Sequence, residues 1–80
     1  MPDTVVSLKT TELANNFVGF MNPTNVGPLE NAVMQALNAA PYNMGVTAVD
    51  ASIEADGRVV KFTLTAPNDL DPASVKAVLR

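Results

Sequence analysis

The fold is decided by residues 49–64, VDASIEADGRVVKFTL. Two segments with alternating apolar and polar residues flank Asp56-Gly57, a pair that accepts the positive φ angles of a two-residue turn. The pattern predicts a β-hairpin in which Ala55 lies opposite Arg58. This register places apolar residues of both strands on one face, in the pairs Ile53–Val60, Ala51–Phe62 and Val49–Leu64. We therefore expect this face to cover the core.

The opposite face of the predicted hairpin is polar. Lys61 lies diagonally between Asp50 and Glu54 on this face, which predicts a solvated network of ion pairs. Because a strand rises about 3.4 Å per residue, the two carboxylates are attached about 14 Å apart, too far for an ordinary acid–base pair. These residues are therefore assigned to the surface and not to catalysis.

A strand and a helix are expected before the hairpin. The segment Thr4-Val5-Val6-Ser7-Leu8 is short and rich in β-branched residues, so it predicts a strand with Val6 and Leu8 on one face and Val5 and Ser7 on the other. Thr10 is a suitable N-cap for a helix that ends near Asn22-Pro23. The apolar residues of that helix recur at helical spacing: Leu13, Phe17, Phe20 and Met21.

The second helix is the best-defined one. It begins at Pro28, where proline suits the first helical position, and Pro41 stops it. Its apolar residues follow a helical repeat: Leu29, Ala32, Val33, Ala36, Leu37 and Ala40. Its polar face carries Glu30, Asn31, Gln35 and Asn38. Met34 lies among these polar residues, which makes it a candidate contact residue or an isolated exposed side chain.

A last helix follows Asp71-Pro72, which place an acid at the N-cap and proline at the first helical position. Leu70 can pack on Val75. The helix carries a short apolar stripe of Val75, Val78 and Leu79. We therefore expect it to dock on the rest of the domain.

The expected element order is β-α-α-β-β-α, in a single small α+β domain spanning residues 1–80. Because one sheet face is polar, we expect a two-layer sandwich whose helices cover only the apolar face. The order is similar to the ferredoxin-like split β-α-β arrangement without its fourth strand. Residues 45–79 also resemble, in pattern, the second half of small metallochaperone-like domains. Those domains bind metal through a cysteine pair that this chain lacks, so the resemblance implies no site and no activity.

Composition narrows the possible functions. The 80-residue chain has 8 acidic and 5 basic side chains and a formal charge of −3. With 48% apolar and 16% charged residues it is too hydrophobic for disorder, yet short enough that a partner could complete a marginal core. The absence of cysteine and histidine excludes disulfides, Ser-His and Cys-His catalysis, and the metal sites built on those ligands.

The charged residues indicate neither nucleic-acid binding nor catalysis. The basic residues are scattered along the chain: Lys9, Arg58, Lys61, Lys76 and Arg80. They form no phosphate-neutralising patch, so we expect no nucleic-acid partner. Asp69 and Asp71 lack the pattern of a calcium loop and are better explained as a turn and a helix cap. We expect no catalytic, cofactor-binding or metal-binding residues.

A membrane span is not expected. Residues 31–49 carry no formal charge, but this stretch contains asparagines, Pro41 and Gly45, which would break a helix in lipid. The N-terminal residues 1–4 lack the basic and apolar regions of a secretory signal. The expected location is the cytoplasm or a virion, without secretion by a signal peptide.

One charge pattern favours a protein interface. Between Glu12 and Asp50 the chain carries a single charged residue, Glu30, and interfaces are depleted in charged side chains. The alternative is a protein that is merely low in charge. The candidate interaction residues, on the first strand, the second helix and the loop after it, are Val5, Val6, Ser7, Leu8, Asn31, Met34, Gln35, Asn38 and Tyr42.

Three functions remain open. The leading hypothesis is a non-enzymatic structural or interaction module, a small subunit of a larger intracellular or virion-like assembly, which binds a protein partner or associates with itself. The alternative is a small acidic inhibitor or adaptor that binds one target protein. A third possibility is a small-ligand binder that uses Phe17, Phe62 and Tyr42, unless the two phenylalanines belong to the core.

Overall fold

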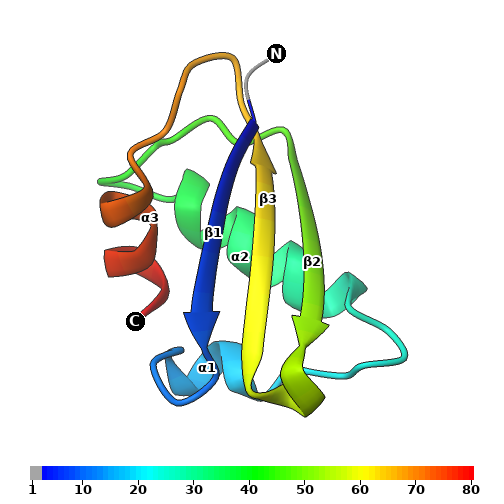
Figure 1. Cartoon of the computed structure of the whole chain (residues 1–80). Coiled ribbons are helices and arrows are strands. Elements are labelled where there is room, and N and C mark those ends of the chain that lie inside the picture. Colours follow the sequence, from blue (N-terminus) through cyan, green and yellow to red (C-terminus); the bar gives the residue numbers. More distant parts are fainter. Residues whose placement is uncertain (1–2) are drawn as a thin grey trace.

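The computed structural model describes residues 3–80. Over these residues it has a three-stranded antiparallel sheet with the strand order β1-β3-β2, and three α-helices. The elements, in chain order, are β1 (Asp3–Lys9), α1 (Asn15–Val18), α2 (Gly27–Asn38), β2 (Ala48–Glu54), β3 (Val59–Thr65) and α3 (Pro72–Leu79). In Figure 1, α2 crosses behind the sheet and α3 lies beside β1; α2 packs against β2 and α3 against β1. The prediction of an α+β domain that contains a hairpin is confirmed. Met1 and Pro2, which entered the prediction about secretion, lie outside the described residues.

The predicted hairpin register is confirmed. Ile53 lies opposite Val60, and Ala51 lies opposite Phe62 on the central strand β3. At the turn, φ is 56° for Asp56 and 89° for Gly57. The residue before the turn also has a positive φ, 53° at Ala55. Strand β2 therefore ends at Glu54, and Ala55 adopts a left-handed conformation that sequence analysis did not anticipate.

Strand β1 has the predicted faces. Val6 and Leu8 are each 2% exposed and belong to the core, whereas Val5 and Ser7 are exposed on the open face of the sheet. Val6 lies opposite Phe62, so both outer strands pack around the central one. The largest fully buried side chains are Phe62, Leu29, Leu37, Leu64 and Leu79.

The prediction of a long first helix is wrong. Helix α1 is one turn, and Thr10 does not cap it: the Thr10 hydroxyl donates to the carbonyl oxygens of Gly57 at 2.8 Å and Arg58 at 3.0 Å. These bonds attach the start of the connection to the hairpin loop. Phe17 remains buried, but Phe20 lies beyond the end of α1 and is 46% exposed. A short isolated helix is marginal in water, so tertiary packing decides its length.

Helix α3 begins as predicted, and α2 begins at Gly27, one residue before the predicted Pro28. Helix α2 starts with proline in its first turn but ends at Asn38, before the expected Ala40. Helix α3 is capped by Asp71, whose carboxylate accepts from the Ala73 N–H and the Ser74 hydroxyl, both at 3.1 Å. No helix in the described part of the chain is long and apolar enough to cross a membrane.

The predicted ion-pair network around Lys61 does not form. Over residues 3–80 the structure shows one ion pair, in which Arg80 and Glu12 are 3.0 Å apart. Lys61 projects from the open sheet face into water, where the attraction between charges is weak and the entropy of a long side chain favours solvation.

Candidate functional site

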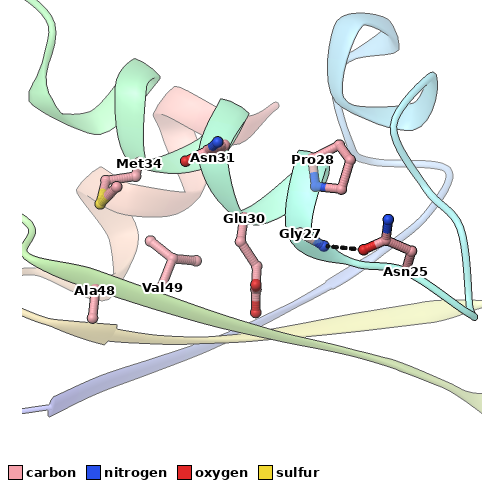
Figure 2. A pocket seen from close by; sticks show the side chains of 8 residues that line it. All are labelled: Asn25, Gly27, Pro28, Glu30, Asn31, Met34, Ala48 and Val49. Atoms are coloured by element: carbon pink, nitrogen blue, oxygen red, sulfur yellow. Dashed lines mark hydrogen bonds between the residues drawn. The ribbon is translucent and has the colours of Figure 1, made fainter.

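The largest hollow described lies between the start of α2 and the edge strand β2. It measures about 670 Å³ and is lined by Asn25, Gly27, Pro28, Glu30, Asn31, Met34, Ala48 and Val49. Figure 2 shows Met34 and Glu30 on the side of α2 that faces the sheet, with Val49 across from them on β2. The loop before the helix is ordered by a hydrogen bond of 3.2 Å from the Gly27 N–H to Asn25 Oδ1, drawn in Figure 2.

Glu30 in this hollow has a structural partner. Its Oε2 accepts a hydrogen bond of 2.8 Å from the backbone N–H of Ala51, in the middle of β2. Because β2 is an edge strand, this N–H has no partner in the sheet. The carboxylate of the single charged residue between Glu12 and Asp50 therefore satisfies one outward N–H at the middle of a strand edge.

Two smaller hollows adjoin the first one. The first, of about 390 Å³, is lined by Gly19, Phe20, Met21, Asn22, Pro23, Asn25 and Pro28. The second, of about 260 Å³, is lined by Phe20, Pro28, Asn31, Ala32 and Gln35. Pro28 lines all three hollows, so they form one continuous surface. We call it the α2 surface and define it by Phe20, Pro28, Asn31, Met34 and Gln35.

The structure brings together only some of the candidate residues. Asn31, Met34 and Gln35 belong to the α2 surface. Asn38 has its amide group engaged: Nδ2 donates to the Val46 carbonyl at 2.9 Å, and Oδ1 accepts from the Val46 N–H at 2.7 Å. Tyr42 is 51% exposed in the loop after α2 and lines none of these three hollows.

The four candidate interaction residues on β1 lie apart from the α2 surface. The side chains of Val6 and Leu8 are buried in the core, so they are not accessible to a partner. Val5 is 51% exposed, and Ser7 is exposed on the same open face. Any contact at β1 must therefore use these two residues or the backbone.

Sequence analysis missed Phe20 as a surface residue. Its spacing from Leu13 and Phe17 fits a helix face, which assigned it to the core. The available signal was the pair Gly19 and Pro23, since glycine weakens a helix and proline ends it. A helix that stops before Gly19 leaves Phe20 without a place in the apolar stripe.

Two of the three aromatic residues considered for a ligand seam are core residues. Phe17 is 3% exposed and Phe62 is 0% exposed, which confirms the core alternative. Within residues 3–80, no three Cys, His, Asp or Glu side chains gather in a way that could hold a metal ion. Comparisons with protein-family models, curated proteins and solved structures found no match to this chain.

Proposed function

We propose that the protein is a non-enzymatic interaction module that binds another protein, or a second copy of itself, through the α2 surface. One observation carries the proposal: the exposed ring of Phe20 lies in a hollowed surface whose other defining residues are uncharged. Interface centres are depleted in charged residues and enriched in aromatic residues and methionine. The α2 surface has this composition.

Burial of the surface would be favourable for a physical reason. Fully burying a phenylalanine side chain stabilises by about 1.5–3 kcal/mol, so covering the exposed half of Phe20 would supply about 1 kcal/mol. Met34 already packs against the core, so it would supply less. Asn31 and Gln35 border these apolar groups and can hydrogen-bond across a contact without the desolvation cost of an ion. The half-buried Glu30 is already hydrogen-bonded, which lowers the cost of covering it.

The wider role we propose is that of a small subunit in a larger intracellular or virion-like assembly. The strand order β1-β3-β2 is compatible with a ferredoxin-like arrangement that lacks the strand beside β1. The marginal core of so short a chain also favours a protein that is stabilised by its neighbours. This interpretation places the protein in the cytoplasm or in a virion.

The test compares Phe20→Glu with Tyr42→Glu, because both residues are exposed but only Phe20 belongs to the α2 surface. The free energy of unfolding of both variants should lie within about 1 kcal/mol of the parent value, because both side chains are about half exposed. Sedimentation equilibrium over a concentration series should show a mass above the 8.4 kDa monomer for the parent and Tyr42→Glu, and a monomer for Phe20→Glu.

If the parent protein stays monomeric, the proposal requires that the α2 surface binds a different protein. That partner should be retained by the parent and Tyr42→Glu and lost by Phe20→Glu. A single target bound one-to-one by a monomer would favour the inhibitor or adaptor alternative. Equal behaviour of Phe20→Glu and the parent in both arms would show that the α2 surface is not an interface.

A further inference from the structure

The two edges of the sheet differ in whether a side chain lies across the middle of the strand. On the β2 edge, the Ala51 N–H donates to Glu30, and the backbone of Val46, just before the strand, pairs with the amide of Asn38. Both covering side chains come from α2. No comparable side chain covers the middle of β1 in the described residues.

The direction of the β1 backbone groups follows from the ladder. Because the Ala51 N–H points away from β3, Ala51 and Phe62 form a non-hydrogen-bonded pair. The N–H and C=O of Phe62 therefore turn toward β1 and bond with Val6, its partner there. Since these directions alternate along a strand, the N–H and C=O groups of Val5 and Ser7 point out of the sheet edge.

Two hydrogen bonds at the end of β1 agree with this assignment. The Thr10 N–H donates to the Arg58 carbonyl at 2.9 Å, toward β3. Thr10 lies an even number of residues after Val6, so its backbone groups should point in the same direction as those of Val6. Lys9 lies an odd number of residues after Val6, so its carbonyl should point away from β3. It accepts from the Glu12 N–H at 2.8 Å, outside the sheet.

The outward groups of Val5 and Ser7 are unpaired within residues 3–80, since no hydrogen bond outside the sheet ladder reaches them. Natural edge strands are normally protected by charges, proline, bulges or a covering segment. Residues 4–8 contain neither a charge nor proline. The edge therefore presents two donors and two acceptors to a further strand.

The helical layer leaves room for one such strand. Two packed helices span about 16–20 Å, whereas three strands span about 14 Å. Figure 1 shows α3 beside β1, reaching past this edge of the sheet. An extended segment would lie over α3, but a second folded copy docked through the same edge would bring its own α3 into that space.

We propose that the β1 edge binds an extended segment of a partner protein as a fourth, antiparallel strand. The site is separate from the α2 surface and stands independently of it. Charge complementarity predicts the residues at the two ends of the partner segment: an acidic residue opposite Lys9 and a basic residue opposite Asp3. Apolar or β-branched residues should lie opposite Thr4, Val6 and Leu8, because these positions face the helices.

The probe is a synthetic peptide with this pattern, acetyl-Asp-Thr-Val-Val-Ser-Leu-Lys-amide, which repeats the sequence of β1 and stands in for an extended segment without the rest of a folded copy. We expect saturable binding to the full chain that slows the hydrogen exchange of the Val5 and Ser7 amides. A peptide with its aspartate and lysine exchanged should bind about fivefold more weakly at low salt, because both end contacts become like-charged. Absence of saturable binding, or equal affinity for the two peptides, would overturn the proposal.

N-methylated peptides test the strand pairing without altering the protein. The amide of the third peptide residue faces Ser7, so its methylation should weaken binding at least tenfold. Methylation of the fourth residue, whose amide points away from β1, should have little effect. An equal loss from both would contradict strand addition.

A protein variant completes the test. Ser7→Pro removes an outward N–H and keeps the ladder with β3, because proline is tolerated where an edge strand faces solvent. It should bind the peptide at least tenfold more weakly than the matched control Ser7→Thr. Phe20→Glu should bind the peptide normally, which separates this site from the α2 surface. A parent dimer abolished by Ser7→Pro would overturn the choice of partner, because a second copy would then occupy the edge.

Discussion

At the residue scale, Ala55 and Gly57 both adopt positive φ angles in the hairpin loop. Their φ angles are 53° and 89°, a region that glycine adopts readily and alanine does not. A Cβ added at Gly57 would meet nothing within 4 Å, so any cost of substitution comes from the backbone conformation alone.

We predict opposite effects of substitution at these two positions. Gly57→Val should destabilise the protein by about 1–2 kcal/mol or more, because a β-branched residue resists positive φ. Ala55→Gly should leave stability unchanged or raise it by up to about 1 kcal/mol, because relief of the left-handed strain outweighs the added chain entropy. Urea denaturation of both variants measures the difference. Parent-like stability of Gly57→Val would refute the assigned turn geometry.

At the scale of elements, α2 does more than cover the core. Its polar residues Glu30 and Asn38 hydrogen-bond to backbone groups of β2 and of the segment that leads into it. The helix thereby holds the edge strand in position and satisfies one N–H, at the middle of β2, that a sheet edge normally exposes.

This arrangement predicts that Glu30→Ala frees the edge of β2. The Ala51 N–H would lose its partner, and its hydrogen exchange, followed by NMR, should become at least tenfold faster. Stability should fall by about 1 kcal/mol, a modest value because Glu30 is only half-buried. Glu30→Gln keeps an acceptor and should show a smaller change in both measurements. Unchanged exchange of Ala51 in Glu30→Ala would contradict the hydrogen bond.

At the scale of the whole molecule, the two phenylalanines Phe62 and Phe20 occupy opposite environments. Phe62 is 0% exposed on the central strand, and Phe20 is 46% exposed beyond the end of α1. A cavity at Phe62 would lie in the core cluster that also contains Leu37 and Leu79, whereas Phe20 does not belong to that cluster.

Phe62→Ala should therefore destabilise the protein by about 3–5 kcal/mol, most of the stability that so small a domain has. Phe20→Ala should lower the stability by only about 1 kcal/mol, because about half of its side chain is already exposed. Thermal unfolding followed by circular dichroism distinguishes the two outcomes. Equal losses would mean that the assigned core is wrong.

Local patterns in the sequence determined the hairpin, its register and the faces of β1. Alternation has a period of two residues and the Asp56-Gly57 turn joins neighbouring strands, so the information lies within a short stretch of chain. The starts of α2 and α3 are local in the same sense. A proline in the first turn favours the start of α2, and the aspartate before α3 caps its first turn.

Only the tertiary structure decided how long α1 is, where Phe20 lies and which edge of the sheet is covered. Thr10 bonds to the hairpin loop 47 residues away, and Glu30 bonds to Ala51, 21 residues away. Helical spacing in the sequence does not reveal these partners. A short helix forms only where packing offsets its cost of nucleation, and an edge is covered only when a distant side chain reaches it.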